Sequence, residues 1–525
     1  MKLRKIYNLS IVCWLMAALL TSCFDDKGNY DYQNINEVTI EGIDRTKVYE
    51  LFSYESTLTI NPVVKSTVGD EKNYDYTWKI IPKNAESEEG DQEKYVVSKE
   101  KNLVYPVTLD DGYYIGFFEV KDLSNGVTWI EDFYLHVKSK GSEGWIIACK
   151  QDGKTRLDLI TKESSGKNVL FPDLWNSLDF DMGEPKRLFY LAGMEAEFMF
   201  PLLVTDKSSY SIMGNDFHVG EDTDMKWYFG LSDGTIDMTA SVIEQYSTTW
   251  LSNWWVINSK GEIYSTEAST AAFFSYPINK LNGKEEFEAA PFIGVSYTYN
   301  DTDEDWNYNY AMVFYDKTNR QFLSKFGANN YPDVMKCTGT QIFDVKTGRD
   351  MVFMDSHVEI DGLQVAVLKD PQTQDFYLYG FTLGFGKIEQ NFYGKIGGPV
   401  SEAIAFALHP TYNTLFYATK NKVYRVSLSE PSTEVKEVLS FDGEDIVTLK
   451  FNKILSWGSS ATSYMSMLLV GTNKVASENE NPGVFRLYEV PSLISGSLSL
   501  NEEIEGLGEI VDIVYNNSSL KISQS

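Results

Sequence analysis

Cysteine and histidine are both scarce in this chain, which has only four of each among its 525 residues. Cys149 and Cys337 lie far apart, and the other two cysteines fall within the first 23 residues. A disulfide framework or a zinc cluster needs several such residues at short spacings, so the sequence excludes both. We expect Cys149 and Cys337 to be small buried apolar residues.

Motifs of the common hydrolases and phosphate-binding proteins are also missing. The sequence has no GxSxG, no HExxH and no phosphate-binding loop, and no histidine has a recognisable nucleophile or metal-ligand partner close by in sequence. We therefore assign no catalytic residue and favour a non-enzymatic function. A glycan hydrolase or lyase that uses carboxylates in a central funnel is the alternative, but 75 acidic residues are too many to choose a pair.

Basic residues are in short supply, since 46 lysines and arginines stand against 75 aspartates and glutamates, for a net charge of −29. Nucleic acid is excluded as a ligand, because its phosphates must be neutralised by lysine and arginine. Adhesion to anionic lipid through charge alone is disfavoured for the same reason. The simplest role of the negative charge is solubility at a crowded surface.

The first apolar run is too short to cross a bilayer, because Ile11–Leu20 has ten residues where a spanning helix needs about 20. Basic residues precede it, as in a secretory signal peptide. The following Leu20-Thr21-Ser22-Cys23 resembles the lipobox of bacterial lipoproteins. The resemblance implies that residues 1–22 are removed and that Cys23 carries the lipid that anchors the protein in the outer membrane. An ordinary signal peptide is the alternative.

Residues 23–36 are acidic and polar without a regular apolar period, so we expect a tether. Acidic residues just after the lipid-bearing cysteine resemble the surface-export signal of Bacteroidota lipoproteins. This resemblance implies the cell surface, and the periplasmic leaflet of the outer membrane is the alternative if the charges belong to a solvated linker.

Residues 37–138 show short runs in which apolar and polar side chains alternate, as in strands with one buried face. Over Trp129–Val137, for example, Phe133 and Val137 share one face while Tyr134 and His136 share the other. Six or seven such strands predict an immunoglobulin-like sandwich. The run around Trp78 and the hairpin that follows it resemble a PKD-type domain, although no Gly-Asp-Gly turn follows Trp78.

A polar, glycine-bearing linker at 139–144 separates this domain from residues 145–525. In the second part, pairs of short apolar strands joined by turns recur about every 54 residues, a period typical of β-propellers. The chain is thus predicted to be all-β, with about seven blades and with six or eight as alternatives. A large two-sheet protein without radial symmetry also stays open. The seven units are centred on Ile146, Leu203, Trp255, Met312, Val365, Phe406 and Leu468.

Aromatic residues interleaved with carboxylates give the candidate ligand site. Sugar rings pack their C–H faces on aromatic rings, and carboxylates accept hydrogen bonds from hydroxyls, so this pattern indicates a glycan or peptide ligand. Packing of the same aromatics between blades is the alternative. The candidate residues are Trp254, Tyr297, Tyr299, Trp306 and Tyr308.

Alternating oxygen ligands at Asp301, Asp303 and Asp305 allow a weak calcium site. Trp306 and Met312 stand where an EF-hand needs glycine and glutamate, so that family is excluded. A solvated acidic loop is the favoured interpretation, and no cofactor is expected.

The mature chain as a whole resembles Bacteroidota PKD-like family lipoproteins, chiefly over Cys23–Tyr32 and the strand Asn36–Ile40. The resemblance implies an accessory lipoprotein beside a Sus-type outer-membrane import pair. Its function would be to capture or present a glycan or peptide nutrient without catalysis. A structural subunit that docks on the transporter is a further alternative.

Overall fold

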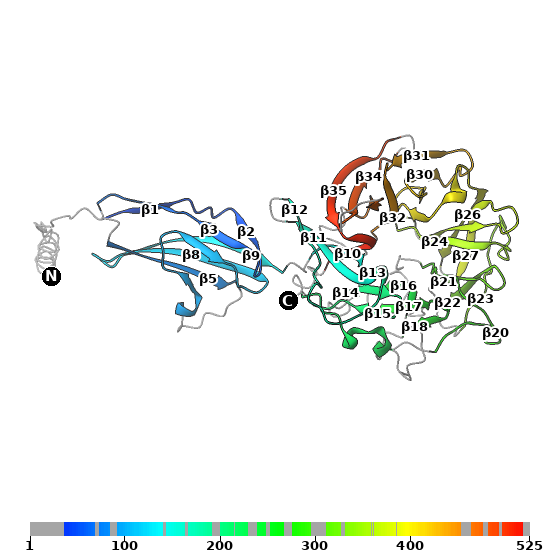
Figure 1. Ribbon diagram of the computed structural model, residues 1–525, viewed down its shortest axis with the longest axis horizontal. Helices are drawn as coiled ribbons and strands as arrows, with labels where there is room; N and C mark the ends of the chain where they lie inside the picture. The colour runs from blue at the N-terminus through cyan, green and yellow to red at the C-terminus, as the bar shows by residue number, and fades with distance from the viewer. Residues whose placement is uncertain are drawn as a thin grey trace, which may run out of the picture. The chain divides into compact units, whose positions relative to one another are not determined.

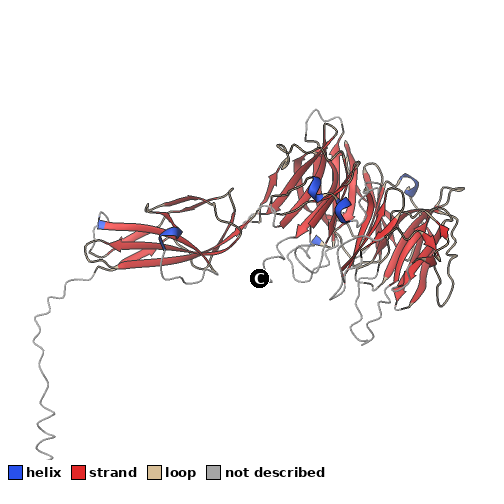
Figure 2. Cartoon of the chain, turned by 90° about the horizontal axis from the view of Figure 1, so that it is seen from below, coloured by secondary structure: helices blue, strands red, loops and turns tan. Residues whose placement is uncertain are grey.

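The computed structural model describes the chain in segments that together cover both predicted domains. The described residues are 36–68, 73–83, 92–139, 143–162, 166–191, 200–214, 216–228, 239–247, 252–266, 276–295, 311–326, 331–358, 360, 362–384, 386–452, 464–475, 481–492 and 496–517. Within them the structure is built from strands, and the helical segments are short 3-10 turns such as η2 (Gln92–Tyr95), η4 (Glu221–Thr223), η5 (Met225–Tyr228) and η6 (Val400–Glu402) (Figure 2).

The chain divides into two compact units, and the first lies entirely before Val137. The first unit is a β-sandwich with a five-stranded sheet of order β2-β9-β8-β5-β6 and two small two-stranded sheets. The bounds of the large sheet are β2 Val48–Phe52, β9 Thr128–Lys138, β8 Gly112–Asp122, β5 Tyr74–Pro82 and β6 Val96–Ser98. The small sheets pair β1 Val38–Glu41 with β4 Val63–Ser66, and β3 Thr57–Ile60 with β7 Leu103–Pro106.

Alternation along the strands places the core of this sandwich. Trp78, Phe118 and Phe133 are each 0% exposed, and the Trp78 ring lies 4.2 Å from Phe118 and 5.9 Å from Phe133, centroid to centroid. On β9, Phe133 and Val137 are fully buried while Tyr134 is 39% exposed. The predicted division of this strand into a buried and an open face is therefore confirmed.

The second unit is a ring of sheets, each a blade of a β-propeller (Figure 1). Seven such sheets are present in the described residues, which confirms the predicted all-β class with about seven blades. Glu143 and Gly144, expected in the linker, already belong to β10. Blade 1 consists of β10 Glu143–Gln151, β11 Lys154–Lys162, β12 Asn168–Phe171 and β36 Glu509–Asn517, blade 2 of β13 Pro185–Leu191, β14 Phe200–Thr205 and β15 Ser209–Ser211, and blade 3 of β16 Ala240–Ser247, β17 Ser252–Asn258 and β18 Ile263–Ser265. Blade 4 consists of β21 Ala311–Asp316, β22 Gln321–Phe326 and β23 Asp333–Val334, and blade 5 of β24 Asp350–Ser356, β25 Leu363–Lys369, β26 Phe376–Gly384 and β27 Lys387–Lys395. Blade 6 consists of β28 Ala405–Leu408, β29 Thr414–Ala418, β30 Lys422–Ser427 and β31 Val435–Ser440, and blade 7 of β32 Glu444–Phe451, β33 Met467–Lys474, β34 Gly483–Glu489 and β35 Ser499–Leu507. A small hairpin of β19 Lys280–Leu281 and β20 Glu285–Glu286 lies between blades 3 and 4 in sequence.

The inner strands of the propeller adjoin one another around the ring. β24 contacts β28, β28 contacts β32, β32 contacts β36, and β36 contacts β13. In blade 4, residues 289–295 run along β21 through the bridges Ala289–Asp316 and Gly294–Val313, and so take the inner place. An inner strand is thus the first strand of its blade in sequence, except in blade 1.

The last strand of the chain closes the ring. β36 pairs with β10 in antiparallel register from Glu143–Asn517 to Lys150–Glu509, which gives blade 1 the order β12-β11-β10-β36. Blade 1 is therefore made from both ends of the propeller sequence, and hydrogen bonds between its strands hold the ring shut.

Six of the seven predicted repeat centres lie on the second strand of a blade, among them Ile146 on β10 and Leu468 on β33. Phe406 is out of phase with them, because it lies on β28, the first strand of blade 6. Every strand of blade 6 carries apolar residues, so composition does not distinguish the first strand from the second.

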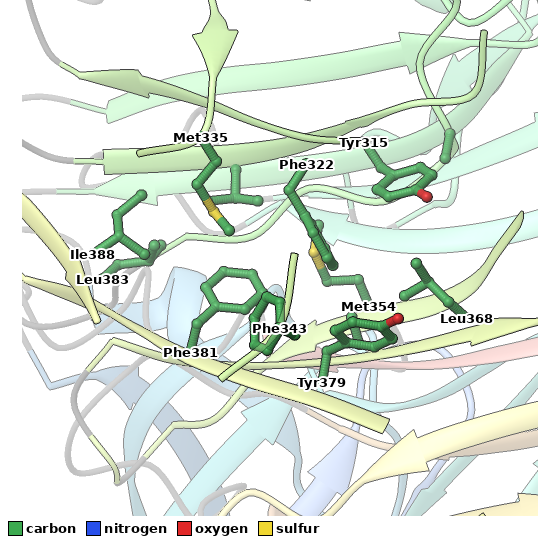
Figure 3. Packing of buried hydrophobic residues seen from close by; sticks show 13 residues of the cluster. Tyr315, Phe322, Met335, Phe343, Met354, Leu368, Tyr379, Phe381, Leu383 and Ile388 are labelled. Atoms are coloured by element: carbon green, nitrogen blue, oxygen red, sulfur yellow. The ribbon is translucent and has the colours of Figure 1, made fainter. Parts of the chain in front are cut away.

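Aromatic rings fill the space between neighbouring blades. Figure 3 shows this packing between blades 4 and 5, where Phe322 lies 5.1 Å from Tyr315 and 5.3 Å from Phe381, centroid to centroid. Phe343 packs edge-on against Tyr379 at 4.9 Å. The abundant Tyr and Phe residues therefore serve the blade interfaces to a large extent.

Candidate functional site

Most of the predicted site residues lie outside the described part of the chain. These are the lipid-bearing cysteine, four of the five ligand-binding aromatics and the three calcium-site carboxylates, namely Cys23, Tyr297, Tyr299, Trp306, Tyr308, Asp301, Asp303 and Asp305. In the described residues, no three side chains of His, Cys, Asp or Glu come together as a metal site. No helix in those residues has the length and apolar character needed to span a membrane.

Trp254 is the one ligand-binding candidate that the structure describes. It lies on β17 and is 4% exposed, with its ring 5.6 Å from Phe200 of blade 2 and 5.7 Å from Tyr228. The ring is part of the core between blades 2 and 3. Trp254 thus packs between blades, which was the alternative interpretation of the sequence, and it offers no ring face to a ligand.

Two histidines have a structural role at the ends of inner strands. His357 follows β24 and His409 follows β28, and the Nδ1 of each accepts a backbone N–H from the turn that follows. Burial lowers the pKa of His409 to about 3, and the nearby Arg425 and His357 act in the same direction. The imidazole of His409 is therefore neutral at ordinary pH and serves as a fixed acceptor.

The two described cysteines are apolar packing residues rather than reactive groups. Cys149 is fully buried on β10, where burial and the neighbouring Asp158 raise the pKa of its thiol. Cys337 is half-buried, and burial raises its thiol pKa as well. Neither thiol has the thiolate character of a nucleophile.

A recurring β-bulge marks the start of the inner strands. In β24, Met351 pairs with Leu368 and Phe353 with Val367, which leaves Val352 without a partner. The same one-residue shift leaves one residue without a ladder partner near the start of four other inner strands. A bulge of this kind interrupts the hydrogen-bond ladder locally and changes the direction of a side chain. The unpaired residues are Lys186, Ser241, Val352, Val447 and Val511.

Blade 6 has its equivalent of the bulge residue in Ile404. The amide of Ile404 donates to the carbonyl of Ala418, while Ala405 already pairs with Ala418 in the ladder. Aliphatic side chains therefore occupy the bulge position on four consecutive blades, 5, 6, 7 and 1. We call this set, Val352, Ile404, Val447 and Val511, the aliphatic arc.

Two of the four side chains of the aliphatic arc are exposed to solvent. Ile404 is 58% exposed and Val447 is 39% exposed, while Val352 and Val511 are half-buried. Neighbouring exposed apolar residues, unlike isolated ones, are typical of binding surfaces. In blade 2 the same position carries Lys186, whose side chain is 50% exposed.

The connections that lead into β32 and β36 are short. Gly508 alone joins β35 to β36, and three residues join β31 to β32. At Gly508, an added Cβ would lie 2.7 Å from the Cβ of Cys149, so only glycine fits this close approach.

A carboxylate stands two residues before the bulge in five blades, at Glu184, Asp350, Glu402, Asp445 and Glu509. Three of these form ion pairs with a cation from a strand end or turn of the preceding blade. The contacts are Lys150–Glu184 at 3.0 Å, Arg320–Asp350 at 2.8 Å and Lys420–Asp445 at 3.5 Å. The recurring carboxylate thus helps to join neighbouring blades, although each exposed ion pair of this kind contributes only about 0–1 kcal/mol to the stability of the fold.

Glu402 and Glu509 are the exceptions. Both are exposed, and neither has a cation within 4.0 Å among the described residues. The cations expected to neutralise them are engaged elsewhere, because Lys369 lies over the ring of Phe376 at 5.6 Å and Lys474 pairs with Glu505 at 2.9 Å. Glu509, however, lies opposite Lys150 in the β10–β36 ladder and interacts with it electrostatically, so Glu402 is the one of these five carboxylates that has no cation partner among the described residues.

Sequence reasoning missed the aliphatic arc, although a signal for it was present. The arc is marked by a carboxylate, one intervening residue and then Val or Ile, as in Asp350-Met351-Val352 and Asp445-Ile446-Val447. This motif is short and its copies stand at uneven spacings. Only the strand pairing shows that the third residue is bulged.

Comparison with known proteins agrees with the two-part architecture. Residues 23–180 match the sequence profile of the PKD-like family, which covers the sandwich and continues through β10–β12 of blade 1. No match is found among the curated proteins.

Several solved structures resemble the chain at a distance. A quinonprotein alcohol dehydrogenase-like protein from Bacteroides thetaiotaomicron has 12% identity and a TM-score of 0.41, over 92% of this chain and 100% of that one. A protein from Lactobacillus plantarum has 11% identity and a TM-score of 0.40, over 71% and 99%. YCF48 from Cyanidioschyzon merolae has 9% identity and a TM-score of 0.35, over 66% and 96%. The strand order and ring closure described above, and not these distant likenesses, define the fold: the protein is an all-β chain with a PKD-like N-terminal domain followed by a β-propeller.

Proposed function

We propose that this protein is a binding protein that takes up an apolar part of its ligand on the aliphatic arc of the propeller. The observation that carries the proposal is the exposure of Ile404 and Val447 at equivalent bulges of neighbouring blades. Each exposed aliphatic side chain that a ligand covers contributes about 25 cal/mol per Å² of apolar area removed from water. Five bulged inner strands, aligned at one end of the ring, provide a fixed surface for such contact.

The chemistry of the arc favours a peptide over a glycan. Sugars stack on flat aromatic faces, whereas valine and isoleucine present branched methyl groups that suit other aliphatic side chains. Phe353 and Phe406, which follow Val352 and Ile404 closely in sequence, pack on each other at 5.7 Å and against the core between blades 5 and 6. These two rings therefore serve the core between the blades rather than a glycan.

We propose that the protein performs this function as a lipoprotein anchored in the outer membrane at the cell surface. In this proposal Cys23 carries the acyl anchor, and the protein presents peptide to a Sus-type import pair without catalysing a reaction. The PKD-like match supports it, because the matched segment begins at residue 23, the residue expected to be the first of the mature chain. Replacing Cys23 with alanine should move the protein from the membrane fraction to the soluble fraction of the cells.

Binding to peptide and glycan arrays tests the proposal, with the chain from residue 24 onward as the probe. Ile404→Asp combined with Val447→Asp should abolish the peptide signal, because the new charges oppose burial of the arc. Leu500→Asp is the matched control, since Leu500 is 51% exposed on β35, the outermost strand of blade 7. Equal loss in both variants, or no peptide signal in the unchanged protein, would contradict the proposal.

A further inference from the structure

The first unit carries a surface that fits a second copy of itself, and we infer that two copies of this chain pack together through the outer face of the five-stranded sheet β2-β9-β8-β5-β6. The contact is isologous, with its two-fold axis along β8, the central strand of that sheet. This inference goes beyond the proposed function, because it concerns the sandwich and not the aliphatic arc of the propeller.

The outer face of this sheet is apolar at its centre. Phe118 on β8 and Phe133 on β9 are fully buried, so the residues that alternate with them along each strand point outward. Among the outward residues, Tyr113, Ile130 and Tyr134 are 49%, 52% and 39% exposed. Half-buried apolar residues on the same face are Ile81, Ile115 and Phe117. Neighbouring exposed apolar residues, unlike scattered ones, are typical of a protein–protein contact.

The other side of the sandwich has the polar surface that is usual for an exposed sheet. Its outward residues on β1, β3 and β4 include the exposed Thr39, Glu41, Thr57, Thr59 and Lys65. The exposed large apolar residues of β1, β3, β4 and β7 are two valines, Val63 and Val104, and they lie on different small sheets. The apolar patch is therefore a property of one side of the domain.

Strand pairing arranges the outward residues of the patch in rows. β5 and β8 pair in antiparallel register, with Ile81 opposite Ile115 and Lys79 opposite Phe117. These two pairs begin a first and a second row that run across the sheet, because residues directly opposite each other in a ladder share a face.

The hairpin of β8 and β9 extends both rows. At its closed end the backbone N–H of Asp122 donates to the carbonyl of Val127, and at its open end the ring of Tyr113 stacks on that of His136 at 4.2 Å. One antiparallel register accounts for both contacts, so the pairing runs between them without a shift.

The two rows are self-complementary about β8. Read from β9 to β5, the first row is Tyr134, Ile115 and Ile81, and the second is Asp132, Phe117 and Lys79. A two-fold axis along β8 lays the β9 side of one copy on the β5 side of the other. In the first row apolar side chains then meet apolar side chains, and in the second row the carboxylate of Asp132 meets the ammonium of Lys79.

The charges of this face are balanced, which also suits a second copy. Its ion pairs are Lys79–Glu119 at 2.7 Å, Lys138–Glu50 at 3.0 Å and Arg45–Asp132. The whole chain has a net charge of −29, so surfaces that share this excess repel each other when two copies meet. A neutral face approaches its own copy without this cost, whereas a face that binds a charged partner carries the opposite sign.

The area of the face matches what a stable dimer needs. Five strands give a width of about 24 Å at about 4.8 Å per strand, and the nine to eleven residues of β5, β8 and β9 give a length of about 30–36 Å. The face therefore offers roughly 700–850 Å² per copy, close to the roughly 800 Å² per partner of a standard interface.

Sedimentation velocity of the chain from residue 24 onward tests the inference. We expect its weight-average mass to rise from one copy to two as the concentration increases through the micromolar range. Ile130→Asp combined with Tyr134→Asp should raise the dissociation constant at least about tenfold, because the contact would bury the new carboxylates. Val63→Asp combined with Val104→Asp adds the same charge to the other side of the sandwich and should leave the mass unchanged.

Cysteine cross-linking tests the axis. A short bismaleimide should join Ile115→Cys to its own copy, because β8 lies on the axis, and should join Tyr134→Cys efficiently only to Ile81→Cys in a mixture of the two variants. Val104→Cys should give no covalent dimer. A chain that stays monomeric throughout the micromolar range, a dimer that persists in Ile130→Asp with Tyr134→Asp, or equal loss in the control pair would overturn the inference. Each of these results leaves the proposed function standing, because peptide binding is measured separately on the arrays.

Discussion

A buried ion pair fastens the closure of the propeller, and its removal gives the most direct test of the fold. Asp158 on β11 is 0% exposed, and Arg156 donates to its two oxygens at 2.7 and 3.0 Å. The same carboxylate accepts the backbone N–H of Gly508 at 2.9 Å and that of Asp173 at 2.8 Å. Since Gly508 joins β35 to β36, this pair links the first blade to the strand that closes the ring.

Asp158→Asn keeps the size of the side chain and removes its charge. The new amide group would face the donors of Arg156 and Gly508, and the guanidinium of Arg156, whose side chain is 7% exposed, would lose its counter-ion. Breaking a buried pair from one side costs about 3–5 kcal/mol, because one charge stays buried without compensation. With about 1.4 kcal/mol per factor of ten, β36 should open roughly a hundred to a few thousand times more often.

Native-state hydrogen exchange of the backbone amides in residues 509–517 measures this opening directly. Protection should fall by the stated factor in Asp158→Asn, whereas the strands of blade 4 should change less. Adding Arg156→Met should restore part of the protection, because no buried charge then remains. Unchanged exchange in the single variant, or strictly additive effects in the double variant, would refute the argument that the pair holds the ring closed.

Three further predictions concern the stability of each part. The pKa of His409 is about 3 in the folded chain and about 6.5 when unfolded, so stability should decline by up to about 1.4 kcal/mol per pH unit as pH falls below 6.5. His409→Asn keeps an acceptor and should flatten this slope relative to the unchanged protein in urea titrations, whereas identical slopes would contradict the assignment. Gly116→Ala should destabilise the sandwich by about 1–3 kcal/mol or more, since an added Cβ would lie 2.1 Å from the ring of Phe133, and a thermal melt of the sandwich shows whether it does. Removing residues 509–517 should expose the edge of β10 and cause self-association, visible by light scattering at micromolar concentration.

The pattern of apolar residues along the chain was enough to predict both kinds of domain. On β9, Phe133 and Val137 are buried and Tyr134 is open, as the period of two requires. The propeller could be predicted from its repeated hairpins, because each blade must bury both faces and so repeats the same apolar runs. Phe406 shows where this reasoning fails, since the first and second strands of a blade are equally apolar.

The candidate site could not be predicted in the same way. Aromatic residues draw attention in a sequence, yet Trp254 is buried between blades, because a large ring is also the best filler of an interface. Aliphatic residues such as Ile404 look like core residues in any sequence. Whether such an aliphatic side chain is buried depends on a one-residue shift in the pairing of two strands, and this shift cannot be predicted from the local composition.

The bulge is the feature that connects the fold of this propeller to its function. On each inner strand the residues after the bulge fill the interfaces between blades, as the buried Met354, Leu449 and Ile513 do, so packing fixes their character. A bulged residue has no partner in the ladder, and where its side chain is exposed, as at Ile404 and Val447, it can differ from blade to blade without cost to the core. Lys186 in blade 2 and Ile404 in blade 6 illustrate this freedom. A set of positions that adjoin one another, face solvent and escape the demands of packing is where a repeating fold can vary its binding specificity while its blades stay the same.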